Sequence, residues 1–92
     1  MDIYDWSENY IGSYEDSHGV IYILSPLHDI NSGFINRGKK GDLTKSSYIL
    51  TQKEDDLFMQ WMANRYRIQP TENGFKLIIG DVISYELFRT FE

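Results

Sequence analysis

Cysteine is absent from the 92 residues, and its absence removes several kinds of scaffold and site. Without thiols the chain forms no disulfide and no thiolate metal centre, which argues against a small secreted, disulfide-rich protein. The first residues lack the basic and apolar regions of a signal peptide, and no apolar run approaches the ~20 residues that span a bilayer. We therefore expect one cytoplasmic domain covering residues 1–92, with no membrane contact.

Catalytic and metal-binding motifs are also scarce. The chain has two imidazoles, His18 and His28, and neither has a second ligand at metal-binding spacing. No serine lies in a G-x-S-x-G nucleophile motif. The segment 33–40 matches the phosphate-binding loop G-x-x-x-x-G-K-[ST] in part, but Lys40 replaces the hydroxyl residue that holds Mg²⁺. We expect no enzymatic activity, no cofactor and no metal site.

Aromatic side chains and carboxylates are what the chain has in quantity. Aromatic residues make up 15% of the sequence, and the formal net charge is −5. Residues 1–16 carry acidic side chains and no Lys or Arg, whereas residues 37–53 are strongly basic. Two blocks of opposite charge on a small protein can steer a charged partner toward it.

The patterns of the N-terminal half predict a hairpin and a long loop. Residues 2–11 are compatible with a helix or with a strand. Residues 10–14 and 20–24 flank a polar connection that ends in glycine, which predicts a hairpin. Residues 26–46 are polar and repeatedly interrupted by glycine, which predicts a long loop of the functional or mobile kind.

One main helix is predicted over residues 52–66. Thr51 and Glu54 have the spacing of a capping box, in which each side chain bonds the backbone amide of the other. The predicted helix is apolar over most of its circumference, more than the ~100° stripe that one sheet contact needs. The surplus predicts a second interface, with a homodimer as one outcome, at Met59, Ala63 and Tyr66.

The C-terminal part is predicted to form strands. Residues 75–79 are continuously apolar or long-chained and follow an Asn-Gly turn signal. Residues 82–88 alternate like the second arm of a hairpin, although Asp81 would also cap a short helix. Together these patterns predict an α+β fold, in which an antiparallel sheet of about four or five strands carries the 52–66 helix on one face.

The acidic N-terminal segment is the predicted protein-binding site. Aromatic side chains are enriched at interface hot spots, and spaced carboxylates can replace phosphates against a basic groove. We expect a small acidic inhibitor that occludes a basic, nucleic-acid-handling surface of another protein. Such a composition suits inhibitors that phages or mobile elements direct against host or defence proteins, where the site of action is the host cytoplasm, and it suits immunity proteins. The predicted site residues are Asp2, Tyr4, Asp5, Trp6, Glu8, Glu15 and Asp16.

The alternative function is a nucleic-acid-binding accessory protein that uses the basic segment 36–48. Its cations would contact backbone phosphates, while the acidic remainder of the chain would repel duplex DNA, so this is the less favoured interpretation. The predicted phosphate contacts are Arg37, Lys39, Lys40 and Lys45.

Overall fold

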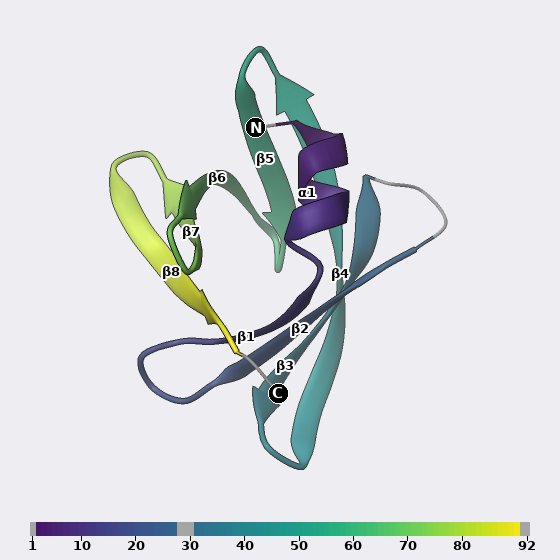
Figure 1. The fold of residues 1–92 in the computed structure, drawn as a ribbon, viewed down its shortest axis with the longest axis vertical. Helices are drawn as coiled ribbons and strands as arrows, with labels where there is room; N and C mark the ends of the chain where they lie inside the picture. The colour runs from purple at the N-terminus through teal and green to yellow at the C-terminus, as the bar shows by residue number, and fades with distance from the viewer. Residues whose placement is uncertain (1, 28–30, 91–92) are drawn as a thin grey trace.

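The computed structural model, which describes residues 2–27 and 31–90, shows an all-β closed barrel (Figure 1). Each strand pairs antiparallel with the next along the chain, and the last strand returns to pair with the first. The elements in chain order are α1 (Ile3–Asn9), β1 (Gly12–Glu15), β2 (Ile21–Pro26), β3 (Ser32–Lys39), β4 (Asp42–Lys53), β5 (Asp56–Trp61), β6 (Asn64–Thr71), β7 (Gly74–Ile79) and β8 (Val82–Arg89). The predicted α+β fold is therefore wrong, because the helix found in the described residues is 7 residues long and lies elsewhere.

The segment predicted to be the main helix, residues 52–66, instead contains two turns and β5. Its large apolar side chains alternate along β5: Leu57, Met59 and Trp61 are buried, whereas Gln60 is exposed. A period of two is the pattern of a strand with one face turned inward. On a helical projection, the apolar residues of β5 and of the β5–β6 turn spread over most of the circumference. In the structure the same residues belong to a strand and a turn, so no broad apolar helix surface exists.

Two local signals explain why this segment resembled a helix. Thr51 and Glu54 have capping-box spacing, yet Thr51 lies within β4 and Glu54 lies in the β4–β5 turn. The β5–β6 turn is made by Met62 and Ala63, which have left-handed φ angles of 51° and 65°. Asn-Gly is the usual sequence for such a turn, and without it the sequence contains no hairpin signal at this point.

Of the other segment predictions, those for strands and hairpins are confirmed and that for the long loop is wrong. The predicted hairpin over residues 10–24 is formed by β1 and β2, and the helical alternative for residues 2–11 is α1. The strand at 75–79 is β7, and the hairpin alternative for 82–88 is β8. The long loop predicted for 26–46 is wrong, because β3 and the first part of β4 occupy most of it.

Side chains fill the barrel, as expected for an eight-stranded barrel. In one aromatic cluster Trp6 of α1 stacks on Tyr10, with ring centroids 5.2 Å apart, and meets the edge of Phe75 at 4.8 Å. Tyr14 meets the same ring at 4.9 Å. A second aromatic cluster is formed by Tyr22, Trp61, Tyr66 and Tyr85. The helix thus covers one end of the barrel, and its Trp6 side chain completes the core.

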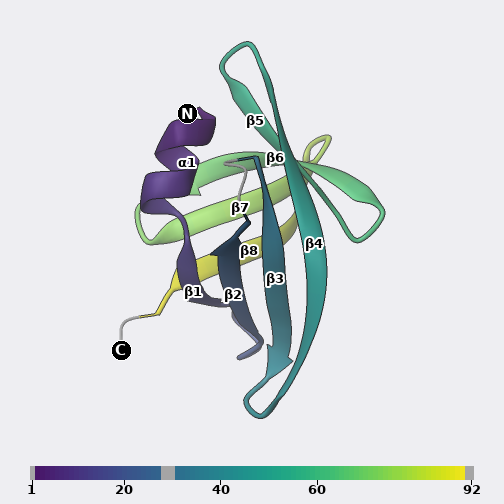
Figure 2. The same ribbon diagram turned by 90° about the vertical axis from the view of Figure 1, so that its right-hand side faces the viewer.

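The barrel closes over a short seam. β4 is the longest strand, and its first part pairs with β3 while its last part pairs with β5, so that it joins the two halves of the barrel (Figure 2). β1 and β8 pair at two positions, Tyr14 with Arg89 and Glu15 with Phe88. Closure pairs the two outer strands at these positions, whereas residues 82–87 of β8 pair with β7 on one side and, in the described part of the chain, with no strand on the other.

The alternation of strand direction divides the turns between two ends of the barrel. The β4–β5 and β6–β7 turns lie at the end that α1 covers, which we call the helix end (Figure 2). The β1–β2, β3–β4, β5–β6 and β7–β8 turns lie at the opposite end, which we call the mouth. Because neighbouring strands run in opposite directions, alternate turns along the chain lie at the same end of the barrel.

We expect Ala63→Gly to raise the free energy of unfolding by about 0.5–1 kcal/mol. A left-handed φ costs a non-glycine residue about 1–2 kcal/mol, and relief of that strain exceeds the about 0.4–1 kcal/mol of entropy that glycine adds to the unfolded chain. Urea denaturation measures the change. Ser47→Gly, on the exposed side of β4, is the matched control and should destabilise the protein. A loss of stability in Ala63→Gly would contradict the assigned turn.

Candidate functional site

The first turn of α1 lies beside the β4–β5 turn. The Asp2 carboxylate accepts a hydrogen bond of 2.9 Å from the Asp5 amide and so caps the helix. The Ile3 amide donates to Oε1 of Gln52 at 3.2 Å, which ties the start of the helix to the end of β4. Nε2 of Gln52 donates to the carbonyl of Glu54, within the turn itself, at 3.3 Å. These bonds bring together two acidic segments, the start of α1 and the β4–β5 turn.

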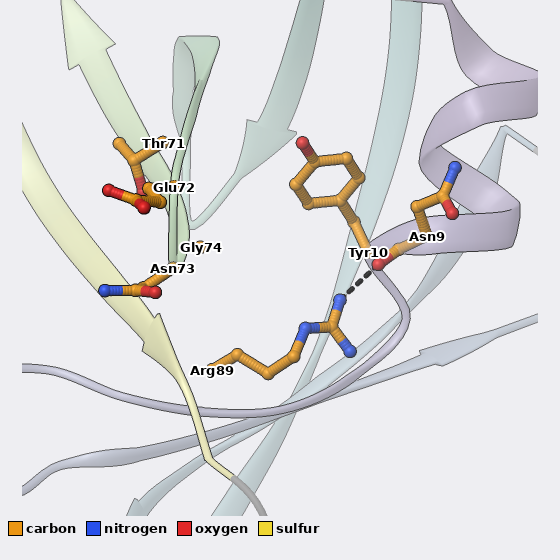
Figure 3. A pocket seen from close by; sticks show the side chains of 7 residues that line it. All are labelled: Asn9, Tyr10, Thr71, Glu72, Asn73, Gly74 and Arg89. Carbon is orange, nitrogen blue, oxygen red and sulfur yellow. Dashed lines mark hydrogen bonds between the residues drawn. The ribbon is translucent and has the colours of Figure 1, made fainter.

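The last turn of α1 faces the β6–β7 turn across a hollow of about 200 Å³ (Figure 3). Arg89 of β8 reaches across it, and Nη2 donates to the carbonyl of Asn9 and, at 2.7 Å, to the hydroxyl of Tyr14. A cation at the C-terminus of a helix is favoured by the helix dipole. Glu72 stands on the facing turn. Arg89 therefore joins the end of α1 to the β1–β8 pair that closes the barrel, and we call this pair of hydrogen bonds the latch.

The helix end is acidic over its exposed surface. α1 and both turns contribute carboxylates, and Lys53 and the latched Arg89 are cations in the same part of the fold. The side chain of Tyr4 on α1 is 67% exposed. The exposed carboxylates of this end are Asp2, Asp5, Glu8, Glu54, Asp55, Asp56 and Glu72. Sequence reasoning missed the contribution of residues 54–56, because their charge was explained by the N-terminus of a helix that does not form.

The structure divides the predicted N-terminal site. Four of its members are exposed on α1 or at its N-cap: Asp2, Tyr4, Asp5 and Glu8. Trp6 is fully buried, so its ring is part of the core and does not reach the surface. Glu15 and Asp16 lie at the β1–β2 turn, at the mouth of the barrel. Only the members on α1 share a surface with the acidic turns.

The residues of the predicted second interface do not share a face. Met59 and Tyr66 are 0% and 3% exposed and belong to the core, whereas Ala63 lies in the exposed β5–β6 turn. The helical face from which that interface was predicted does not exist. The argument for a homodimer from surplus apolar surface is thereby removed.

The predicted phosphate contacts lie on the β3–β4 hairpin and point in two directions. Three of them are exposed: Lys39, Lys40 and Lys45. Arg37 instead lies against the aromatic cluster, with its guanidinium carbon 5.5 Å from the ring centroid of Tyr22 and 5.6 Å from that of Tyr85. The hairpin therefore exposes three lysines, of which Lys39 shares one side of β3 with Arg37, while Lys45 lies on the opposite side, across from Asn36.

A chain of polar contacts links Asp16 to Arg37 through Tyr22. The Tyr22 hydroxyl donates to Oδ2 of Asp16 at 2.7 Å, and Oδ1 accepts from the amides of His18 and Val20 at 2.9 and 3.1 Å. Burial opposes ionisation of Asp16, but these hydrogen bonds outweigh it and lower the pKa below its usual value. Burial raises the pKa of Tyr22 to about 12. Hydrogen bonding to Tyr22 raises the pKa of Arg37, which therefore stays charged.

We expect stability to fall between pH 10 and 12. Burial raises the pKa values of Tyr14 and Tyr22 from 10.0 to about 12. As the pH rises, the unfolded chain loses these phenolic protons near pH 10, before the folded protein does. The contribution of the two tyrosines to the free energy of unfolding is therefore complete below pH 10 and is lost as the pH rises through 12. Urea denaturation followed across this range measures the loss. Tyr22→Phe should make the fall in stability with pH less steep. The same substitution should lower the free energy of unfolding by about 1 kcal/mol at neutral pH, because the hydrogen bond to Asp16 is lost. An unchanged pH dependence would contradict the raised pKa of Tyr22.

We expect Arg89→Met to lower the free energy of unfolding by about 2 kcal/mol, because methionine retains apolar contact with Tyr14 but loses two charge-assisted hydrogen bonds. Amide hydrogen exchange should accelerate first in α1 and at the seam. Arg65→Met, at an exposed arginine of β6 that stacks on Phe58, is the matched control and should lower stability by no more than about 0.5–1 kcal/mol. Equal effects of the two substitutions would show that Arg89 does not act as a latch.

Among residues 2–27 and 31–90, no helix is long and apolar enough to cross a membrane. No set of three or more histidine and carboxylate side chains in those ranges is placed to hold a metal ion. No family model, curated protein or solved structure matches this chain. The charge and geometry of the two ends of the barrel are the features of the molecule that bear on its function.

Proposed function

We propose that the protein binds a basic surface of another protein through its helix end and thereby blocks that surface. One observation carries the proposal: the bond between the Ile3 amide and Gln52 joins two acidic segments that lie 49 residues apart in the sequence. Carboxylates from α1 and from the β4–β5 turn then form one exposed surface. A continuous acidic surface attracts a basic partner and raises the rate of association.

The exposed side of α1 has the composition of a contact surface. Asp5 and Glu8 are three residues apart and Tyr4 and Glu8 four apart, so the three side chains share one side of the helix. The opposite side is anchored by Trp6 in the core. A tyrosine at the centre of such a surface can enter a pocket on the partner, and the carboxylates around it can pair with Lys and Arg. Because the helix is held at both ends, little ordering entropy is lost on binding.

A protein surface that handles nucleic acid is the partner that we propose, since its cations are arranged to bind rows of anions. Carboxylates on α1 and the adjoining turn would replace the phosphates of the nucleic acid. The alternative is an accessory protein that binds nucleic acid through the β3–β4 hairpin. Three exposed lysines favour this alternative. The logarithm of the binding constant falls with the logarithm of the salt concentration by about 0.9 per phosphate contact, so three lysines would supply weak and salt-dependent binding.

The test replaces three carboxylates on the helix with their amides: Asp2→Asn, Asp5→Asn and Glu8→Gln. Asparagine is as good an N-cap as aspartate, so α1 should remain folded and the thermal midpoint nearly unchanged. Partners are captured from a lysate of the cells that express the protein, with and without nuclease, and association rates are then measured against the captured partner. We expect association at least about 10-fold slower at low salt, and a flatter salt dependence.

The matched control removes the same charge elsewhere, by Glu15→Gln, Asp81→Asn and Glu86→Gln, and should leave the association rate within about twofold of the parent. A second control, Lys39→Gln with Lys40→Gln and Lys45→Gln, addresses the hairpin. If nuclease removes the captured partner and the lysine variant abolishes binding, the accessory function is correct. If the helix variant associates as fast as the parent at low salt, the acidic surface is not the binding site.

A further inference from the structure

A cavity of about 430 Å³ opens at the mouth of the barrel, between the β3–β4 hairpin and the β5–β6 turn. Ligand sites usually occupy about 300–1,000 Å³, and the mouth of a barrel is one of their common locations. Macromolecules do not fit a cavity of this size, but a small organic molecule does. The side chains that line it include Arg37, Lys39, Asp42, Thr44, Ser46 and Met62.

The register of the hairpin places the charges of this cavity. Arg37 pairs with Thr44 across the β3–β4 ladder, and Lys39 pairs with Asp42. Residues two apart on a strand lie on the same face, so both cations are on the side that faces the cavity. Of the residues that line the cavity, one carboxylate, Asp42, stands against the two cations Arg37 and Lys39. Asp16, which Tyr22 links to Arg37, is a second anion nearby, so the cations are balanced overall and Arg37 is the cation that a ligand would meet beside the aromatic cluster.

Arg37 is held in place before any ligand binds. Its guanidinium lies over the rings of Tyr22 and Tyr85, whose centroids are 6.2 Å apart, and arginine stacked in this way loses little freedom on binding. Within the described part of the chain, its buried Nε has no hydrogen-bond acceptor. A guanidinium binds carboxylates and phosphates through paired N–H groups, and Arg37 is among the residues that line the cavity.

The wall behind Arg37 is rigid. Nε1 of Trp61 donates to Oγ of Ser46 at 2.7 Å, and that hydroxyl donates to the carbonyl of Ile35 at 3.3 Å. Trp61 is 1% exposed and is part of the same aromatic cluster. At the rim, Met62 is 51% exposed and offers a flexible apolar contact. The cavity therefore combines a fixed cation, a hydroxyl from Thr44 and an apolar rim.

We propose that this cavity is a binding site for a small organic oxyanion, a carboxylate or a phosphate ester. The oxyanion binds the guanidinium of Arg37 and the hydroxyl of Thr44, Lys39 adds positive charge, and Met62 covers the organic part of the ligand. The site is distinct from the acidic surface on α1 and shares no residue with it.

The experiment titrates the ¹⁵N-labelled protein with benzoate, phenyl phosphate and the uncharged control benzyl alcohol, and follows amide and arginine side-chain resonances by NMR. We expect saturable shifts of the Arg37 Nε–H and of the Thr44 and Met62 amides, with a Kd of about 1 mM or tighter for at least one oxyanion. Benzyl alcohol should bind at least about 10-fold more weakly, because it lacks the charge-assisted hydrogen bonds. The stronger of the two anions identifies the ligand class.

Three variants locate the site. Arg37→Gln should weaken binding at least about 10-fold, whereas Arg65→Gln, which removes an exposed arginine stacked on Phe58 at 4.2 Å, should leave it unchanged. Thr44→Trp fills the cavity from an exposed strand position and should abolish binding even if Arg37→Gln disturbs the fold. The proposal is overturned if neither oxyanion gives saturable shifts, or if Thr44→Trp binds as the parent does.

Discussion

Closure of the barrel is the constraint on which the remaining structure depends. β1 and β8 pair at two positions, so the backbone ladder alone makes a weak seam. Side chains supply the rest: Trp6 enters the core against Phe75, and Arg89 bonds both the end of α1 and the hydroxyl of Tyr14. The short helix thus closes the barrel with one side and presents its acidic side to solvent. The binding surface proposed on α1 is held rigidly, since moving the helix would take Trp6 out of the core.

The up-and-down topology explains why charges that are distant in the sequence are collected at two ends. Alternate turns belong to the same end, so the acidic β4–β5 turn joins α1, and the lysines of the β3–β4 turn are placed at the mouth. The N-terminal acidic block is divided by the same rule, because the β1–β2 turn carries Glu15 and Asp16 away from the helix. Asp16 then accepts three hydrogen bonds there, which makes it part of the local structure.

Sequence patterns predicted the elements whose signals are local. The first hairpin and the strand at 75–79 each have turn or alternation signals within a few residues, whereas residues 2–11 carried both helix and strand signals and the structure resolves them as α1. The helix at 52–66 was predicted wrongly because Met62 and Ala63 form a left-handed turn without glycine or asparagine, so two strands appeared as one continuous apolar segment. The inward direction of Arg37 was equally hidden, since it depends on the barrel closing around Tyr22 and Tyr85. The acidic surface required the contact between Ile3 and Gln52, which no local pattern contains.

The two ends of the barrel act independently through their charges. The molecule measures 38 × 31 × 26 Å along its principal axes, whereas the Debye length is about 8 Å at physiological ionic strength. Carboxylates on α1 therefore contribute little to the potential at Arg37, and the groups that set it are Lys39, Asp42 and the Asp16–Tyr22 pair at the mouth itself. Mechanical coupling would need an element with two alternative packings, whereas the described residues pack around one filled core. The oxyanion proposed for the mouth and the basic partner proposed for the helix end would consequently bind at the same time, each with the affinity that its own end determines.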